Sequence, residues 1–296
     1  MLPKMNVLTF DIEEWYTEKL KKTPSNEAYK EFDNILSIIL DTLDRIDAKG
    51  TFFCVGALAR EYPDVVKRIH SKGHEIGCHS DIHLWLTQMN EAQLFEDTRI
   101  ALDSLEQVIG EKVISYRAPA FSITNNNRWA FSVLEQCGIK NDSSVYPALR
   151  DFGGYEEFPS TMPTIIETGT GILKEFPIPL KHVLKRKFAY SGGGYFRFFP
   201  LALIQYWMSH DRYSMTYFHI RDLMSQEVKL LDKDAYEAYF KEPGTIVNRY
   251  KRYLKSNIGK QDSLKKLIKL LSEMPFISLN QANMNIDWNE AEIIKL

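Results

Sequence analysis

Short apolar runs alternate along this chain with longer segments in which apolar residues recur every three or four positions. Such runs are typical of buried strands, and such segments are typical of amphipathic helices. The predicted strands lie at residues 6–10, 51–55, 74–78 and 113–116. The predicted helices lie at residues 27–48, 57–72, 91–110 and about 126–137. Alternation of strand and helix at this spacing predicts βαβ units and a parallel sheet, either open or closed into a barrel.

The second half of the chain has a looser pattern. Between residues 145 and 200, five prolines and the run Gly192–Gly194 interrupt the periodicity, which indicates long loops and short β segments. Residues 214–220 predict one further strand. From about residue 232 onward the chain predicts amphipathic, lysine-rich helices. We therefore expect a main domain over residues 1–231 and a helical extension over residues 232–296, packed on the same domain.

Composition and charge narrow the class of protein. The chain has 296 residues, of which 44% are hydrophobic and 26% are charged, as in ordinary globular proteins. The formal net charge of −2 gives no global electrostatic argument for nucleic-acid binding. Basic residues cluster locally at Lys181, Lys185, Arg186 and Lys187, and again at Lys251, Arg252 and Lys255. These clusters fit solvated faces, or attraction to an anionic surface or a phosphate-bearing substrate.

The cysteines and the N-terminus suggest a compartment. Three cysteines do not form a disulfide framework, and their apolar surroundings suit small buried residues of a reducing compartment. The first eleven residues show neither the long apolar region nor the cleavage site of a signal peptide. No stretch approaches the roughly 20 apolar residues of a membrane span. We expect a cytoplasmic protein.

Chemically active side chains follow the predicted strands. Acidic residues follow the first strand in "TFDIEEWY" (9–16), two histidines follow the third in "CHSDIH" (78–83), and Arg117 follows the fourth. His219 lies near the end of a later strand. Catalytic groups of parallel α/β proteins gather at the ends of strands, so these side chains are expected at one rim. Two histidines four residues apart fit either a metal-ligand pair or one packed and one exposed residue.

An ordered set of motifs decides between these readings. The segments "TFDIEEW", "GTFFCVG", "GHEIGCHSDIH", "YRAPAFSI", "NDSSVYP" and "YFH" together resemble the polysaccharide deacetylases of the NodB-homology group. With "SGGGYFRFFP" (191–200), the chain is most similar to the branch associated with exopolysaccharide and surface-glycan gene clusters. The resemblance extends from residue 5 to about residue 222. It implies a distorted (β/α) barrel, here with a C-terminal helical extension. It also implies that both histidines bind a metal.

The resemblance assigns a catalytic base and a metal site. Asp11 matches the family's base, and Glu13, His79 and His83 match its metal ligands. Glu14 is the alternative to Glu13, but side chains alternate along an extended segment, so that Asp11 and Glu13 share a face while Glu14 turns away. Two imidazoles and one carboxylate suit Zn²⁺, with Co²⁺, Ni²⁺, Mn²⁺ and Fe²⁺ as alternatives. Zinc is the default expectation.

The resemblance also assigns groups around the substrate. Arg117 matches the arginine that pairs with the base, and His219 matches the general acid that protonates the departing amine. The backbone N–H of Ala120 is the candidate donor to the oxyanion. Asp142 matches a motif that lines the groove, and either Asp142 or Asp222 is expected to orient the acid.

Several aromatic residues lie in the same segments. The expected sugar-binding walls are Trp15, Phe121 and Tyr195, because aromatic rings beside polar loops suit a sugar site.

The predicted function is metal-dependent hydrolysis of the N-acetyl group of an amino sugar in a surface polysaccharide or its precursor. The alternatives are hydrolysis of another C–N bond, in a small amide or a cyclic imide, and glycan binding without catalysis. The expected partner is an acetylated glycan and not nucleic acid. Peripheral contact with membrane-bound glycan machinery is a further expectation.

Overall fold

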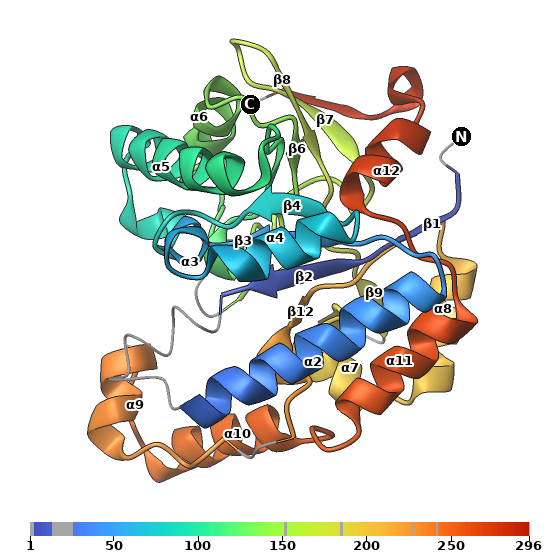
Figure 1. The fold of residues 1–296 in the computed structure, drawn as a ribbon. Helices are drawn as coiled ribbons and strands as arrows, with labels where there is room; N and C mark the ends of the chain where they lie inside the picture. The colour runs from blue at the N-terminus through green and yellow to red at the C-terminus, as the bar shows by residue number, and fades with distance from the viewer. Residues whose placement is uncertain are drawn as a thin grey trace.

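The computed structural model describes residues 3–13, 26–150, 153–183, 186–225, 228–240 and 242–295 (Figure 1). A nine-stranded sheet forms its centre, with the strand order β12-β2-β3-β4-β5-β6-β8-β7-β13. Neighbouring strands are parallel except β7 and β8. The strands of this sheet are β2 (Thr9–Ile12), β3 (Thr51–Cys54), β4 (Glu75–Cys78), β5 (Ser115–Tyr116), β6 (Asn141–Asp142), β7 (Thr164–Glu167), β8 (Ile172–Glu175), β12 (Phe218–His219) and β13 (Ile293–Lys295).

The predicted α/β class is confirmed, whereas a closed barrel is not seen. Strands β12 and β13 end the sheet on its two sides, and no pairing joins them within the described ranges. Two further pairs lie outside this sheet: β1 (Met5–Val7) is parallel to β11 (Tyr213–Met215), and β9 (Lys181–Val183) is antiparallel to β10 (Arg186–Phe188). The predicted strands at 6–10 and 214–220 are thus each divided into two short strands.

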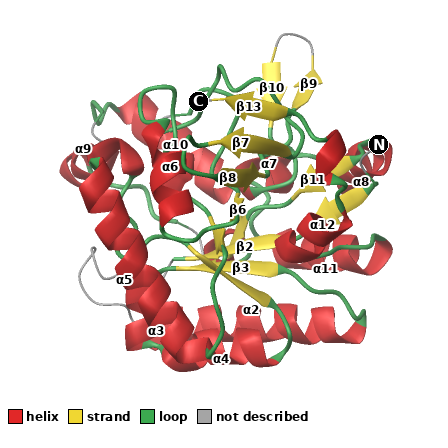
Figure 2. Cartoon of the chain, turned by 90° about the horizontal axis from the view of Figure 1, so that it is seen from above, coloured by secondary structure: helices red, strands yellow, loops and turns green. Residues whose placement is uncertain are grey.

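Helices surround the strands, as Figure 2 shows from above. Their bounds are α2 (Asn26–Arg45), α3 (Gly56–Glu61), α4 (Pro63–Ser71), α5 (Glu91–Ile109), α6 (Trp129–Gln136), α7 (Gly193–Phe198), α8 (Leu201–His210), α9 (Lys233–Phe240), α10 (Ile246–Asn257), α11 (Ser263–Glu273) and α12 (Leu279–Asn285). Short 3₁₀ helices are η1 (Leu86–Gln88), η2 (Pro119–Phe121), η3 (Ile220–Asp222) and η4 (Trp288–Glu290). In these described parts of the chain, no helix has the length and apolar character that crossing a bilayer requires.

Local chemistry explains where the helices begin and end. The single helix predicted over 57–72 is two helices, because Pro63 has no N–H to continue the first one and instead begins α4. The cap predicted for α5 is confirmed, since Asn90 and Gln93 form a reciprocal capping box. Gly110 ends α5 with a φ of 76°, a left-handed conformation that suits glycine.

The C-terminal part of the chain shares the core of the main sheet. Helix α11 buries Leu267, Leu270 and Leu271 in the same apolar cluster as Phe10 and Phe52. Beyond α12 the described chain is not a long helix: the short 3₁₀ helix η4 is followed by β13, which adds a parallel strand beside β7. These contacts place residues 263–295 against the sheet that carries the site.

Candidate metal centre and surrounding acid–base groups

Three candidate metal ligands converge at the carboxyl ends of β2 and β4, the strands on either side of β3. Glu13 directly follows β2, and His79 directly follows β4, with His83 in the loop behind it. One donor atom from each residue lies within 4.8 Å of the other two. The His79 Nε2–Glu13 Oε2 distance is 3.2 Å, and the His83 Nε2–Glu13 Oε2 distance is 2.5 Å. The spatial arrangement expected of the three predicted ligands is therefore present.

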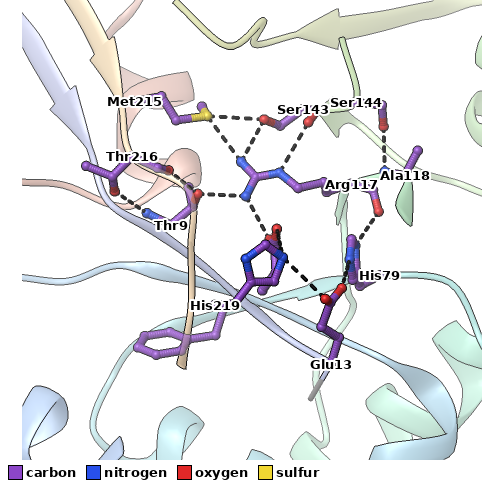
Figure 3. A network of polar contacts seen from close by, with 12 residues as sticks. Thr9, Glu13, His79, Arg117, Ala118, Ser143, Ser144, Met215, Thr216 and His219 are labelled. Carbon is purple, nitrogen blue, oxygen red and sulfur yellow. Dashed lines mark hydrogen bonds and ion pairs between the residues drawn. The ribbon is translucent and has the colours of Figure 1, made fainter. Parts of the chain in front are cut away.

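A backbone carbonyl fixes the orientation of the His79 ring. Its Nδ1 lies 2.7 Å from the backbone carbonyl oxygen of Arg117, so the Nδ1–H donates to that oxygen (Figure 3). This tautomer leaves the Nε2 lone pair facing Glu13. A carbonyl that accepts from the far side of an imidazole is the usual support for a histidine that binds a metal.

His83 is aimed at the same point by a strained loop. Its φ is 59° and that of Ser80 is 63°, both in the left-handed region, which costs free energy for residues other than glycine. The His83 N–H donates to Ser80 Oγ at 2.8 Å, and the Asp81 N–H donates to Asp97 Oδ2 at 2.9 Å. The His83 Nε2 atom is buried, and its approach to Glu13 lacks hydrogen-bond geometry. A buried nitrogen without a hydrogen-bond partner fits a metal ligand.

The charges around Glu13 favour its ionised form. Burial by itself raises the pKa of Glu13, but the charges of His83 and His219 and the hydrogen bond with His79 hold that pKa well below its ordinary value. An ionised carboxylate and two imidazole nitrogens in a buried place are a donor set that suits Zn²⁺ and similar transition metals. The residues present therefore fit the expected cation.

Asp11 lies on the same side of its strand as Glu13 but has a different partner. Its carboxylate is buried, and Oδ1 accepts a hydrogen bond from Arg117 Nη1 at 2.8 Å. The predicted pair of Asp11 and Arg117 is present. Asp11 is thus held in place by Arg117, and its other carboxylate oxygen faces His219.

The Arg117 side chain is fully buried and surrounded by acceptors (Figure 3). It donates to Thr9 Oγ1 at 2.8 Å, to Ser143 Oγ at 2.9 Å and to the Ser143 carbonyl at 3.2 Å. Its guanidinium also lies 4.3 Å from the centroid of the Phe53 ring. A buried charge with so many partners is rigid, and it fixes the Asp11 carboxylate in one position.

His219 lies between the two carboxylates. Its Nε2 is 3.3 Å from Glu13 Oε1 and 3.9 Å from Asp11 Oδ2. Its Nδ1 is 3.1 Å from Asp222 Oδ2, and Asp222 in turn forms an ion pair with Arg197 at 2.5 Å. Burial by itself lowers the pKa of His219, but the charge of Glu13 and the hydrogen bond with Asp222 raise it to about 9. Of the two aspartates expected to orient His219, Asp222 makes the contact.

Asp142, which is expected to line a groove, lies on a strand inside the protein. It is fully buried on β6, and it lies opposite Glu175 of β8 in the strand register. Burial raises the pKa of Asp142 to about 6, and burial together with the charge of Asp142 raises that of Glu175 well above its ordinary value. Ser144 Oγ donates to Asp142 and accepts from the Ala118 N–H at 2.8 Å. Asp142 therefore supports the loop after Arg117 from inside the protein.

The structure describes three of the four remaining predicted residues. Ala120 is partly exposed with a φ of 55°, in the loop that Arg117 begins. Phe121 is buried against Tyr217, with ring centroids 5.3 Å apart. Tyr195 is half-buried and meets the ring of Phe188 edge-on. Trp15, like the alternative ligand Glu14, lies outside the described residues.

Sequence analysis did not assign a role to Arg197 or to Glu175. Arg197 lies in the segment "SGGGYFRFFP" (191–200), and its place in that motif could have indicated a role near the site. No motif contains Glu175. It lies opposite Asp142 only because β6 pairs with β8, which the sequence pattern does not show.

Two family profiles match adjacent halves of the chain. The profile described as polysaccharide deacetylase matches residues 3–141, and the profile described as a domain of unknown function (DUF3473) matches residues 143–283. A peptidoglycan-N-acetylglucosamine deacetylase of Bacillus cereus is 29% identical over 146 residues, which cover 46% of this chain and 54% of that protein. The peptidoglycan-N-acetylmuramic acid deacetylase PdaA of Bacillus subtilis is 28% identical over 113 residues, covering 36% of this chain and 43% of that protein. The chain thus spans about half the length of the curated relatives that it matches.

A solved structure supports the fold over the whole chain. A protein of Mycobacterium smegmatis, described provisionally as a polysaccharide deacetylase, superposes with a TM-score of 0.66. The match covers 100% of this chain and 94% of the other at 16% sequence identity. The arrangement of strands and helices on both sides of residue 142 is therefore shared with another protein.

Proposed function

This chain belongs to the polysaccharide deacetylase family, and from that premise we propose that it is a metal-dependent deacetylase of an N-acetylated amino sugar. The proposed substrate is a surface polysaccharide or its precursor. Two relatives are named as deacetylases of N-acetylglucosamine and N-acetylmuramic acid in peptidoglycan, which supports an N-acetyl sugar as the substrate class.

The proposal depends on one observation above all. Glu13, His79 and His83 bring three donor atoms within 4.8 Å of one another, beside a second carboxylate that has its own cationic partner. These three residues would hold the cation. When bound, the cation supplies Lewis-acid chemistry, because it polarises an amide carbonyl and makes a water molecule more acidic.

Asp11 is the proposed general base. Its Oδ1 is occupied by Arg117 Nη1, which leaves Oδ2 to accept the proton of the water that attacks the amide carbon. The buried guanidinium of Arg117 holds the Asp11 carboxylate in one orientation, as a positioned base requires. The new bond joins the water oxygen to the acetyl carbon, and the backbone N–H of Ala120 is the proposed donor to the oxygen that becomes negative.

His219 is the proposed general acid. Asp222 accepts from its Nδ1–H at 3.1 Å, so that Nε2 is the nitrogen that faces the reacting groups. Proton transfer from Nε2 to the amide nitrogen allows the C–N bond to break. The products are acetate and the free amino sugar, and Phe121 and Tyr195 are the proposed walls for the sugar.

Release of acetate tests the proposal directly. The purified chain, stripped with a chelator and then reloaded with Zn²⁺ or Co²⁺, is incubated with N-acetylglucosamine oligomers and with peptidoglycan. We expect acetate from the reloaded protein and almost none from the stripped protein. A metal-loaded, folded protein that releases acetate from neither glycan would refute the proposed activity on amino sugars.

A further inference from the structure

Helix α10 is turned so that its apolar side faces outward. Ile246, Val247, Tyr250, Leu254 and Ile258 are each between 46% and 62% exposed. At 100° per residue these positions fall within about 120° of the helix circumference. None of the residues of α10 is buried. An amphipathic helix normally turns such a stripe toward the core, so this orientation needs a reason.

The polar side of α10 faces the protein instead. Arg249 Nη1 donates to the Leu231 carbonyl at 3.1 Å, and Arg252 lies 3.6 Å from Glu242. Asn257 binds the backbone of Val228 twice: its Oδ1 accepts from the N–H at 2.8 Å, and its Nδ2 donates to the carbonyl at 3.0 Å. These bonds fix the rotation of the helix. By an approximate rotation of 100° per residue, Arg249 and Arg252 lie at about 300° and 240° from Ile246, so their contacts hold the side of the helix away from the stripe against the protein. Asn257 lies at about 20°, within the arc of the stripe, and it anchors the last residue of the helix to the segment at Val228.

Positive charge borders the apolar stripe. Lys251 and Lys255 are exposed and follow the stripe on the helix circumference at 140° and 180° from Ile246, by the same approximate rotation of 100° per residue. Among the described residues of 228–260, the exposed charged side chains are four lysines, at 229, 233, 251 and 255, and two aspartates, at 232 and 234. The neighbouring segment adds two exposed apolar side chains, Val228 and Leu230. The local surface is thus apolar and basic together.

From this surface we propose that α10 docks the protein on an anionic phospholipid membrane. Apolar side chains on one arc with lysines along its edge are the pattern of a helix that lies in the membrane interface. A second copy of the chain would present the same lysines, so a symmetric contact would bring like charges together. An anionic bilayer complements both the apolar stripe and the lysines. In Figure 1, α10 forms a border of the molecule, where a flat surface can reach it.

The docking helix lies close to the candidate metal centre. Arg197 donates from Nη2 to the carbonyl of Lys255 in the last turn of α10, at 3.1 Å, and its Nη1 pairs with Asp222. One guanidinium therefore connects α10 to the carboxylate that orients His219. A protein docked through α10 keeps this centre near the lipid surface. The docking itself does not depend on the proposed activity.

Sedimentation with vesicles tests the proposal on the full chain. The probes are vesicles of phosphatidylcholine alone and of phosphatidylcholine with phosphatidylglycerol, at low and high salt. We expect the protein to sediment with the anionic vesicles at low salt and much less with neutral ones. Replacing two stripe residues in the double variant Ile246→Gln and Leu254→Gln should lower the vesicle partition coefficient by about tenfold.

A matched control separates the stripe from general surface hydrophobicity. The double variant Ile172→Gln and Ile293→Gln removes two isoleucines that are each 53% exposed on β8 and β13, and it should bind vesicles like the original chain. Helix content from circular dichroism checks that both variants are folded. Equal loss in both variants, binding without preference for anionic lipid, or no binding at all would overturn the proposal. Loss of a dimer in the α10 variant alone, with no vesicle binding by the original chain, would assign the stripe to a second copy instead.

Discussion

Asp11 and Glu13 are two carboxylates on one side of one strand, and their neighbours give them different chemistry. Asp11 accepts from a fully buried guanidinium, whereas Glu13 lies beside imidazole nitrogens. Spacing along the strand explains why both point into the same place. The difference between a proposed base and a proposed ligand comes from residues more than 60 positions away. At the scale of single residues, the surroundings therefore decide the role.

The substitution Asp11→Asn tests this separation of roles. We expect bound Zn²⁺ to be unchanged, because Glu13, His79 and His83 remain, while acetate release falls by at least about 100-fold because an amide does not accept the proton. Emission spectroscopy measures the metal, and an acetate assay measures the rate. The control is Asp47→Asn, an exposed residue with a left-handed φ of 51° that asparagine adopts readily. Full activity in Asp11→Asn would remove Asp11 as the base.

The substitution His219→Ala tests the proposed acid. We expect metal content to stay the same and turnover of N-acetyl sugars to fall by about 100-fold or more, since their amine departs poorly without a proton. An acetyl ester with a nitrophenol leaving group should be affected far less. The exposed His210 offers the control substitution His210→Ala. If His219→Ala slows both substrates equally, proton donation to the leaving group is not its function.

At the scale of elements, the strands bring the site residues together and the loops orient their side chains. The parallel strands β2, β4 and β5, with β3 between β2 and β4, bring the residues that follow them to one rim of the sheet. The loops then aim the side chains through backbone conformations that only tertiary contacts maintain, with left-handed φ at Ser80, His83, Ala120 and Phe121. Strain at these positions is concentrated where the predicted ligands and oxyanion donor lie.

The substitution Ala120→Gly measures this strain. Glycine adopts a φ of 55° without a steric penalty, so we expect the free energy of unfolding to rise by about 0.5–1 kcal/mol. The control Ala92→Gly, at an exposed position in the first turn of α5, should lower it by about 0.5–1 kcal/mol. Urea unfolding midpoints give both values. A loss of stability in Ala120→Gly as large as that in Ala92→Gly would show that the loop is not strained.

At the scale of the whole molecule, the site joins segments that are far apart in the chain. Glu13, His79 and Arg117 come from the half matched by the deacetylase profile, whereas His219 and Asp222 come from the other half. Arg197 extends the network to α10 in the C-terminal part. A cation held by Glu13, His79 and His83 would therefore tie the end of β2 to the loop after β4, and its binding should be linked to global stability.

Metal removal tests that linkage. A ligand that binds the native state only, at about 100 times its Kd, adds about 2.7 kcal/mol to the free energy of unfolding. For a chain of this size we expect a rise in Tm of about 5–10 °C on adding Zn²⁺ to the stripped protein. In His83→Ala the rise should disappear. A Tm that responds to Zn²⁺ equally in both proteins would place the metal elsewhere.

The sequence alone was sufficient for features that depend on neighbouring residues. Periodicity predicted the strands and the helices of the first half, and capping chemistry predicted the start of α5, because these depend on residues within one or two turns. The order of the motifs indicated the deacetylase family, and it predicted that Glu13, His79 and His83 lie together, as they do in the structure. It also predicted the pairing of Asp11 with Arg117.

Only the tertiary structure decided which distant groups meet. It showed that Asp222 is the partner of His219 and that Asp142 lies inside the protein beside Glu175. The spacing of residues along the chain does not predict these contacts, because they depend on which strands pair and which side chains are buried. It also turned the apolar stripe of α10 outward, against the expectation from amphipathicity, because Arg249 and Arg252 on the other side contact Leu231 and Glu242. Local rules fix the elements, whereas contacts between distant segments fix which face each element shows.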